Sequence, residues 1–467
     1  MNALLLNPVD VLFFRDGRPM TGSLAGHSAA WPLPDVTNHA LHAALHRAGL
    51  NGVHLHRRGK SGTYSDERSR RFGSLLTSGP FPVDAKGRWF FPRPKDAQLH
   101  QSWETTLFPI IPDASREAGW GNWGSLPKTL KYAVGSALPP SKEAGGEPWI
   151  SLEAFNAYLR RDQSSFHTDS SAHFLADDCI ADKEAHMGIG IDPETQTTGA
   201  GEAEGRIYSA HYLRLRDGFR LGMLAKAEDK DFNHPTHGND LVKALINGHP
   251  AHIVVGGQQR ICTAELKEPN PLPLPQGLSS TADFATLPKG KFAVKWVLLS
   301  PAVWPKISAT KKDGSPQNAH PGGWLPNWIH PETGQVLLTS GVGVKKAARK
   351  GGSPGQTIAA RLVAAVVPKP LVVTGWALPN PANLSDPQQS PQGGAKSTHL
   401  AVAAGAVYYF EADSADQAVA LANALNWHGT TAGSEIKNRR STLLGEKGYG
   451  LGVCGTWKHF EERPATS

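Results

Sequence analysis

The first 268 residues contain apolar segments in an order that restricts the possible folds. The segments indicate a strand, a helix, two strands, a second helix and a last strand. They lie at residues 3–14, about 37–48, 206–215, 219–224, 240–246 and 251–255. This is the β-α-β-β-α-β order of ferredoxin-like, split βαβ folds. The order predicts an α+β protein.

Turn and cap residues support these assignments. Helix formation is expected to begin near Asp35 or Thr37 and to stop at Gly49, because glycine commonly ends a helix. Asp217-Gly218 between two apolar runs predicts a hairpin. Residues 51–182 are irregular apart from one short helix after Ser151. We interpret that stretch as a long insertion in an N-terminal module of residues 1–268.

A second series of elements follows residues 269–290, whose prolines predict a stiff linker. Strands are expected at 292–299, 361–373, 402–410 and 453–457, with a helix at 415–427. Ser414 and Gln417 have the spacing of a capping box at the start of that helix. Residues 291–467 therefore predict a second ferredoxin-like, RRM-like module, with a basic insertion at about 305–356.

The composition is that of a globular chain with many turns. Hydrophobic residues make up 39% of the 467 residues, and 49 glycines with 36 prolines predict long loops. No apolar run is long enough to span a membrane, and the N-terminus lacks the features of a signal peptide. Cys179, Cys262 and Cys454 are widely spaced, which predicts buried free thiols. We therefore expect a cytoplasmic protein without membrane contact.

Positive charge is concentrated in one segment of the chain. The formal net charge is +7. Between Pro301 and Arg361 there are eight Lys or Arg residues and two acidic residues, so this segment alone carries a net +6. Such a segment suits nucleic acid electrostatically. A solubilising loop would have the same composition.

Residues 445–452 contain four glycines, a lysine and a tyrosine after a basic segment. Glycine lets a backbone approach a ligand closely, and successive N–H groups in such a loop can bind an anion. A phosphate chain that carries bases fits this pattern, which predicts RNA or single-stranded DNA. A mobile loop between a helix and a strand explains the same pattern. The candidate contacts are Lys437, Arg439, Arg440, Lys447, Gly448, Tyr449 and Gly450.

The N-terminal turn is a second candidate. Arg15 and Arg18 flank Asp16-Gly17 directly after an apolar strand, and two guanidiniums on a tight turn can bind phosphate oxygens. An ion pair between Asp16 and an arginine that fixes the turn is compatible with this role. His27 is a further candidate RNA contact. Beside Ser28 it also has the chemistry of an acid–base pair for RNA cleavage, although a turn histidine bonded to the backbone is a simpler interpretation.

Other chemical motifs are incomplete. The stretch at 351–357 departs twice from the phosphate-loop motif, because Lys350 and Gln356 stand where glycine and lysine are required. The chain has no G-x-S-x-G and no H-E-x-x-H sequence. We therefore predict no catalytic residue, no metal site and no cofactor.

Eight short segments occur in the same order as in a known family. They are LFFRDGRPM at 12–20, GHSAAWPLP at 26–34, HMGIGID at 186–192, EGRIYS at 204–209, VGGQQR at 255–260, TGW at 374–376, AAGAVYYF at 403–410 and GYG at 448–450. Together they resemble the third subunit of the type III-B CRISPR effector, the Cmr complex. That subunit is a RAMP-superfamily protein of the Cas-five-like group.

The resemblance implies two RAMP modules of ferredoxin-like fold in a non-catalytic subunit at the foot of the effector. It implies that the chain holds the 5′ repeat-derived handle of the CRISPR RNA and meets target RNA only indirectly. The implied protein partners are the large polymerase-like (Cas-ten-type) subunit and the neighbouring RAMP backbone subunit. The RNA contacts that the resemblance implies are Arg15, Arg18, Gly256, Gly257, Arg260, Lys447, Gly448 and Gly450.

The chain departs from the family pattern at three positions. His39 and His42 stand where the family helix often has glycine and arginine, and Gln258 stands where an acidic residue often follows Gly-Gly. An alternative function is a metal-independent RAMP endoribonuclease that processes precursor CRISPR RNA, with His27 or His42 as general base. A scaffold with no RNA contact of its own is a third alternative.

Overall fold

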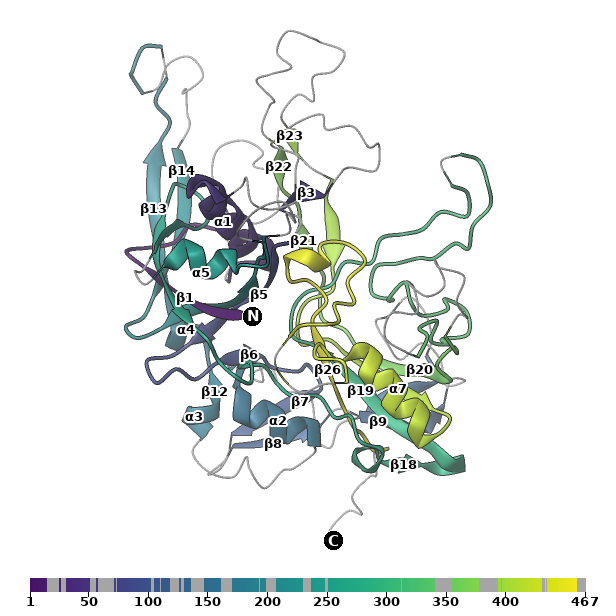
Figure 1. Cartoon of the computed structure of the whole chain (residues 1–467). Helices are drawn as coiled ribbons and strands as arrows, with labels where there is room; N and C mark the ends of the chain where they lie inside the picture. The colour runs from purple at the N-terminus through teal and green to yellow at the C-terminus, as the bar shows by residue number, and fades with distance from the viewer. Residues whose placement is uncertain are drawn as a thin grey trace. The chain divides into compact units, whose positions relative to one another are not determined.

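The computed structural model divides the chain into two compact units (Figure 1). Unit 1 comprises residues 1–87, 178–268 and 372–400, and unit 2 comprises residues 88–177, 269–371 and 401–467. The residues described are 1–14, 25–26, 31–50, 56–57, 71–72, 74–101, 105–109, 111–117, 126, 130–135, 147–160, 170–192, 194–198, 207–229, 237–247, 251–311, 313–340, 355–377, 394–395, 397–430, 433 and 435–459.

The chain leaves and re-enters each unit. We expected residues 51–182 to be an insertion within the first module, whereas residues 88–177 have their contacts in unit 2. The expected boundary after residue 268 coincides with a passage of the chain from unit 1 to unit 2. The division therefore follows long-range packing more than position along the sequence.

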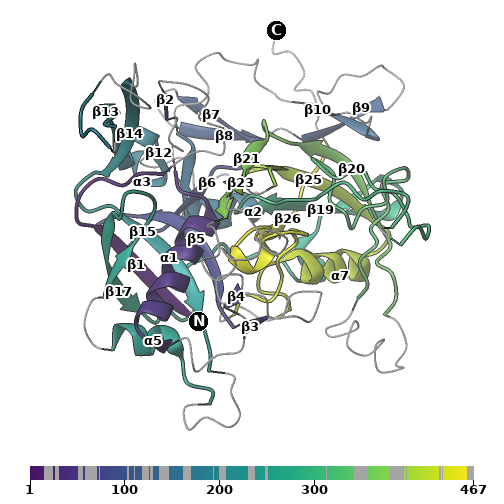
Figure 2. The same ribbon diagram turned by 90° about the horizontal axis from the view of Figure 1, so that it is seen from above.

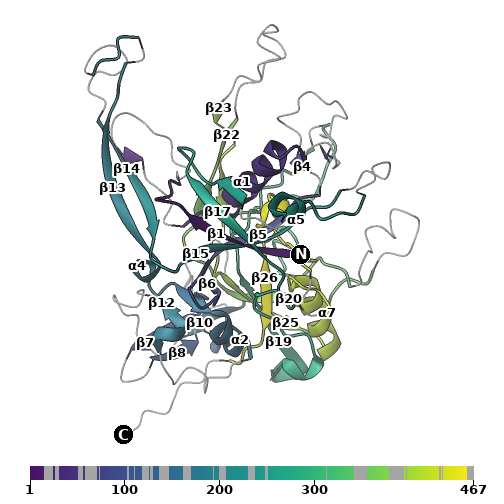
Figure 3. The ribbon, with the colours of Figure 1, turned by 60° about the vertical axis from the view of Figure 1, so that its left-hand side comes forward.

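Unit 1 contains a five-stranded sheet in the order β16-β17-β1-β15-β5. All four pairings are antiparallel. Two helices, α1 and α5, contact strands of this sheet and each other, as Figure 3 shows. The elements are β1 (Asn2–Pro8), α1 (Pro34–Arg47), β5 (Leu76–Val83), β15 (Arg220–Lys226), α5 (Leu241–Ile246), β16 (Ala251–Val254) and β17 (Ile261–Lys267).

Local sequence explains several of these elements. Residues 3–6 of β1 are all buried, so both faces of this strand are covered. Leu41 and Leu45 of α1 are buried one turn apart, and Gly49 follows the helix with a φ of 71°. The Asp240 side chain caps α5 by accepting hydrogen bonds from the backbone N–H groups of residues 242 and 243. The predicted helices are confirmed, whereas the strand expected at residues 3–14 ends at Pro8.

The hairpin expected at Asp217-Gly218 is wrong. Strand β14 (Ile207–Leu215) pairs with β13 (Ala181–Ile189) and with β2 (Ala25–Gly26), whereas β15 pairs with β1 and β5. The two predicted strands exist, but the chain passes from one sheet to another between them. The turn expected at Asp217-Gly218 is present, but the local sequence does not determine which strands β14 and β15 pair with.

Strand β5 lies in the stretch that we expected to be irregular. Its sequence contains Pro80 and Pro82, which argue against a central strand because proline cannot donate to the ladder. The strand occupies the edge of the sheet, where proline is tolerated. Strand β17 was also not expected; it pairs with β1 on one side and with β16, the strand expected at residues 251–255, on the other.

Unit 2 contains a sheet in the order β18-β19-β25-β20, with β26 also paired to β19. Helix α7 covers one face, where Leu421 and Leu425 pack in a core that includes Trp296 and Phe410 (Figure 2). The elements are β18 (Thr286–Leu287), β19 (Lys291–Leu298), β20 (Ala360–Val366), β25 (Val407–Ala412), α7 (Ala415–Leu425) and β26 (Gly452–Gly455).

The start of α7 satisfies half of the predicted capping box. Ser414 accepts a hydrogen bond from the backbone N–H of Gln417, as expected. The Gln417 side chain instead accepts from the backbone N–H of Ala359 at a distance of 2.7 Å. Gln417 therefore ties the helix to the segment before β20.

Residues 88–177 supply polar partners for the strands of unit 2. The Lys131 ammonium and the Tyr132 hydroxyl both donate to Glu411 of β25, at 2.8 and 2.7 Å. Asp96 is fully buried and accepts from Tyr158 and Tyr409. Figure 2 shows β9 and β10 on the side of the sheet away from α7.

The proline-rich stretch at 269–290 is packed within unit 2. Leu272, Leu274 and Leu278 are at most 4% exposed, and Leu278 and Phe284 belong to the main core. The segment expected as a basic insertion likewise contributes core residues, among them Leu325 and Ile329. Buried apolar side chains thus anchor stretches that we had interpreted as linker and loop.

Shorter elements complete the described structure. They are β3 (His56–Arg57), β4 (Arg71–Phe72), β6 (Phe90–Pro92), β7 (Ala97–Gln101), β8 (Thr105–Pro109), β9 (Ile111–Glu117), β10 (Tyr132–Gly135), β11 (Trp149–Ser151), α2 (Leu152–Arg160), α3 (Ser170–His173), β12 (Phe174–Leu175), α4 (Asp177–Ile180), β21 (Leu371–Val373), β22 (Trp376–Ala377), β23 (Gly394–Ala395) and β24 (His399–Ala401).

The cysteines are free, and burial was predicted correctly for two of the three. Cys262 and Cys454 are buried, and desolvation raises the pKa of the Cys262 thiol to about 12. Cys179 is exposed, which corrects our expectation. Among the described residues, we find no helix with the length and apolar character needed to cross a bilayer.

Candidate nucleic-acid interface

The predicted site residues fall into three groups. Arg15, Arg18 and His27 lie outside the described residues, so their roles stay predictions. Gly256, Gly257 and Arg260 lie in unit 1, between β16 and β17. The C-terminal group at residues 437–450 lies in unit 2. The two described groups have different surroundings.

The first glycine loop, residues 255–260, is an exposed turn with a strained backbone. Gly256, Gln258 and Gln259 have positive φ angles of 79°, 56° and 53°, a conformation that favours glycine. A Cβ atom on Gly256 would lie 2.5 Å from the Phe13 carbonyl oxygen, so the backbone of the loop approaches the end of the first chain segment closely. The backbone N–H of Gly257 donates to that same oxygen at 2.9 Å.

Aromatic side chains surround the ring of Tyr212, which β14 places beside this loop. The Tyr212 hydroxyl donates to Gln258 at 2.7 Å. The Arg260 guanidinium lies over the Tyr212 ring, 4.9 Å from its centroid. The rings of Phe13 and His186 pack on Tyr212 with centroid distances of 5.4 and 4.7 Å. The arrangement joins the glycine loop to the β13–β14 ladder.

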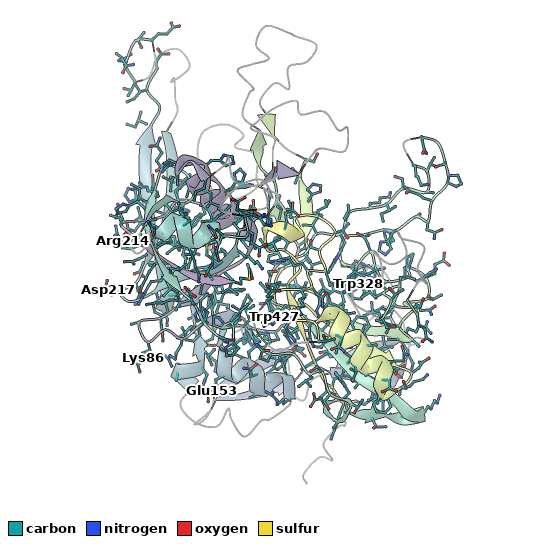
Figure 4. All side chains as sticks on the ribbon, viewed as in Figure 1. Lys86, Glu153, Arg214, Asp217, Trp328 and Trp427 are labelled. Atoms are coloured by element: carbon teal, nitrogen blue, oxygen red, sulfur yellow. The ribbon has the colours of Figure 1, made fainter. Side chains whose placement is uncertain are left out.

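Charged side chains form a second layer of this site. The Asp10 carboxylate lies 3.1 Å from a guanidinium nitrogen of Arg214 and 3.4 Å from one of Arg260. Arg214, labelled in Figure 4, also pairs with Glu184 across the ladder. A hydrogen bond from Arg214 holds the pKa of Glu184 below its usual range. The two guanidiniums are therefore balanced by two carboxylates.

Strands β13 and β14 form an arm that extends beyond the glycine loop, at the upper left of Figure 1. His186 faces Tyr212, and because side chains alternate along a strand, Met187 and Ile189 lie on the opposite face. Met187 is 79% exposed and Ile189 is 58% exposed. The arm thus presents apolar side chains to solvent on one face and an aromatic cluster on the other.

The C-terminal glycine loop is packed into unit 2. Tyr449 is fully buried, so the stacking face that we expected it to offer is not accessible in this structure. The backbone N–H of Gly450 donates to the Pro301 carbonyl at 2.7 Å. Gly450 has a φ of 75°, and a Cβ atom there would collide with the backbone nitrogen of Ser441. These glycines permit close packing within the unit.

Two of the predicted basic contacts, Arg439 and Arg440, are also partly buried within unit 2. The Nε of Arg440 donates to the carbonyl of Ala424 near the end of α7, at 2.6 Å, where the helix dipole favours a cation. Burial lowers the pKa of Arg439 and of Arg440 to about 10. Lys437 is exposed, whereas Lys447, Arg439 and Arg440 are each half-buried, so Lys437 is the most exposed cation of the group.

Sequence reasoning missed several members of the unit 1 site. Asp10, His186, Tyr212 and Arg214 were not singled out as contacts, although residues 186–192 were among the segments that carried the family resemblance. Alternation along two strands would have placed His186, Tyr212 and Arg214 on one face. That signal becomes usable only once β13 and β14 are known to pair.

Comparison with known proteins identifies the family and little else. The family model of the CRISPR-associated protein Cas_Cmr3 matches residues 4–457. No match was found among curated proteins. Since the match to the family model covers nearly the whole chain, the assignment rests on it.

Solved structures give weaker likenesses. A chain in the cryo-EM structure of the type III-B Cmr-beta bound to cognate target RNA has a TM-score of 0.35 and 14% identity, covering 87% of this chain and 86% of that chain. A chain of the Csm3-Csm4 subcomplex of the type III-A CRISPR-Cas interference complex has a TM-score of 0.33 and 9% identity, covering 87% and 92%. A chain of the Csm1-Csm4 cassette in complex with AMPPNP has a TM-score of 0.27 and 12% identity, covering 70% and 90%.

Proposed function

Because the chain belongs to the Cas_Cmr3 family of CRISPR-associated proteins, and is thus a type III CRISPR effector subunit, we propose that it holds the CRISPR RNA in a type III-B effector. The match of the family model to residues 4–457 is the observation that carries this proposal. The part of the RNA that it would hold is the 5′ repeat-derived handle.

The strand orders support the finer proposal of two ferredoxin-like RAMP modules. In unit 1 the sequence of elements β1, α1, β5, β15, α5 and β17 gives the spatial order β17-β1-β15-β5. In unit 2 the elements β19, β20, β25, α7 and β26 give the matching order β26-β19-β25-β20. A split βαβ fold has this order, with its last strand beside its first. The first helix has no counterpart in the described residues between β19 and β20.

The exposed loop of unit 1 is the best-supported RNA contact. The loop has an exposed glycine backbone and the partly exposed cation of Arg260, and the exposed ring of His186 lies near it on β13. Cations contact phosphates, while rings stack on unstacked bases of single strands. Arg15, Arg18 and His27 precede this part of unit 1 in the sequence and remain proposed contacts.

We further propose that the chain bridges the large polymerase-like subunit and the neighbouring RAMP backbone subunit. The apolar residues on the β13–β14 arm, Met187, Ile189 and Ile191, offer exposed contact area of the kind that subunit interfaces bury. Target RNA would then be met through neighbouring subunits.

In this proposal the subunit holds RNA without cleaving it. The test is to assemble the effector with and without this chain, sequence the RNA that copurifies, and map which nucleotides crosslink to it. Crosslinks confined to the repeat-derived 5′ end support the proposal, and their absence would contradict it.

The endoribonuclease alternative needs a separate assay. The purified chain is incubated with a repeat-containing transcript in the absence of metal. Defined products that disappear in His27→Ala or His42→Ala would replace our proposal by the processing enzyme. In the structure the ring of His42 packs against that of His46 at 4.6 Å on α1.

A further inference from the structure

The carboxylate of Asp10 occupies a position between two arginines. It lies 3.1 Å from Arg214 and 3.4 Å from Arg260, which come from β14 and from the end of the first glycine loop. An oxyanion at this spacing accepts charge-assisted hydrogen bonds from both guanidiniums. The arrangement is an anion site filled by the protein's own side chain.

The site is exposed, unlike an ion pair of the protein core. The side chains of Asp10, Arg214 and Arg260 are 55%, 46% and 28% exposed. Ion pairs at this exposure contribute little to stability, because water screens them and two long side chains must be ordered. A hydrogen bond from the Val11 backbone and then Arg214 keep the pKa of Asp10 below its usual range, so the carboxylate is ionised at neutral pH.

The two arginines are held in place by other contacts when Asp10 is removed. Arg260 lies over the Tyr212 ring and is within 3.4 Å of the Gln258 side chain. Arg214 retains its pairing with Glu184. The guanidiniums are therefore pre-oriented, and a ligand that displaces Asp10 finds both donors in position.

We propose that Arg214 and Arg260 form a seat for a backbone phosphate of single-stranded RNA, and that Asp10 is a built-in competitor for this seat. The inference rests on the proposed RNA-holding function, and it adds Arg214 as a contact and Asp10 as a negative determinant of affinity. A phosphate replaces a weakly held carboxylate. The exposed His186 ring lies on the same aromatic cluster, where the adjoining base can stack.

The test measures binding of a short fluorescein-labelled single-stranded RNA to the full-length chain by anisotropy at several salt concentrations. Asp10→Asn removes the competing charge and keeps the side-chain shape. We expect it to bind RNA roughly threefold to tenfold more tightly. Asp217→Asn is the matched control, because it removes one exposed carboxylate from the same unit at a turn, and it is expected to change affinity by less than about twofold.

The arginine variants test the seat directly. Arg214→Gln and Arg260→Gln should each weaken binding and reduce the slope of log affinity against log salt by roughly 0.7, the value for one phosphate contact on a single strand. Arg216→Gln is the control, since Arg216 directly follows β14 and forms its ion pair with Asp182 of β13, away from Asp10. In the double variant Asp10→Asn with Arg214→Gln, most of the increase in RNA affinity produced by Asp10→Asn should be lost.

The outcomes separate this inference from the function on which it rests. If the unmodified chain binds RNA and Asp10→Asn binds it equally well or more weakly, the phosphate seat is wrong, while the RNA-holding function stands. No RNA binding by the chain or by the assembled effector overturns both. Millimolar inorganic phosphate should compete with RNA less strongly in Arg214→Gln than in the unmodified chain. Equal competition in both would also contradict the phosphate seat.

Discussion

The two units contain the same three kinds of side chain in contact, in opposite surroundings. In each, a cation lies beside an aspartate and over a tyrosine ring. In unit 1 the guanidinium and the carboxylate are partly exposed above a buried tyrosine ring, whereas all three side chains of the unit 2 set are buried. The residues are Asp10, Arg260 and Tyr212 in unit 1, and Asp96, Lys295 and Tyr158 in unit 2.

The distances are similar, so burial is the main difference. The cation–carboxylate distance is 3.4 Å for Arg260 and 3.5 Å for Lys295. Asp96 is fully buried and accepts hydrogen bonds from Tyr158 and Tyr409 at 2.5 and 2.9 Å. A buried charge pair fixes its surroundings, because removal of one partner leaves the other desolvated and unpaired. An exposed pair can exchange its partner for a ligand.

The glycine loops repeat this contrast. The loop at 255–260 holds its backbone at the surface, while the loop at 445–450 is packed around the buried Tyr449. Figure 4 labels Trp427, another fully buried residue, whose indole N–H donates to the Pro275 carbonyl at 2.7 Å. A glycine-rich sequence can therefore serve two different purposes: it can let a ligand approach the backbone, or it can let the chain pack closely within the protein.

The largest expected effect separates the two aspartates. Asp96→Ala should lower the free energy of unfolding by roughly 3–5 kcal/mol, because it removes the buried carboxylate that pairs with Lys295 and accepts from Tyr158 and Tyr409. Asp10→Ala should have a much smaller effect on stability, because its ion pairs are exposed and screened by water. Urea unfolding of both variants measures the difference, and equal losses would refute the contrast.

Glycine substitutions test the packed loop. Gly450→Ala should destabilise the protein by about 1–3 kcal/mol, because alanine is strained at positive φ and its Cβ would meet the Ser441 backbone. Gly445→Ala is the control, since the nearest atom to its Cβ is 3.7 Å away. Thermal unfolding of the pair decides whether this loop is a packing element; similar midpoints would argue that it is not.

The basic residues before that loop should separate into structural and surface classes. Arg440→Ala should cost about 1–2 kcal/mol of stability, because the guanidinium donates to the Ala424 carbonyl. Lys437→Ala should stay within about 0.5 kcal/mol, since Lys437 is exposed. If Lys437→Ala and Arg440→Ala weaken RNA binding equally while both keep full stability, the C-terminal group is an RNA contact after all.

The smallest expected effect is a pH dependence in unit 2. Burial lowers the pKa of His320, whose Nδ1 accepts hydrogen bonds from the backbone N–H of Gly322 and from Asn327. The folded state favours the neutral ring. The contribution of His320 to the free energy of unfolding is therefore complete above the unfolded pKa of about 6.5 and is lost as the pH falls below that value. The slope should not exceed about 1.4 kcal/mol per pH unit. Unfolding of His320→Gln at the same pH values should show a shallower slope.

Local sequence gave good predictions where one segment decides its own structure. Helices α1, α2, α5 and α7 and strands β1, β14, β15, β19 and β26 were expected close to their observed positions, because apolar spacing and caps are local properties. The pairing of β14 with β13 was not predictable in this way, and strand β5 was hidden by its prolines. Both depend on which distant segment lies alongside.

The candidate site shows the same limit. Glycines at 256 and 257 and a cation at 260 follow from the sequence, as does the family to which the chain belongs. Only tertiary structure shows that Asp10, His186, Tyr212 and Arg214 gather around that loop, and that Tyr449 and Arg440 turn inward. Residue type determines which contacts a side chain can make, whereas burial and long-range packing determine which of those contacts it makes and whether a ligand can replace them.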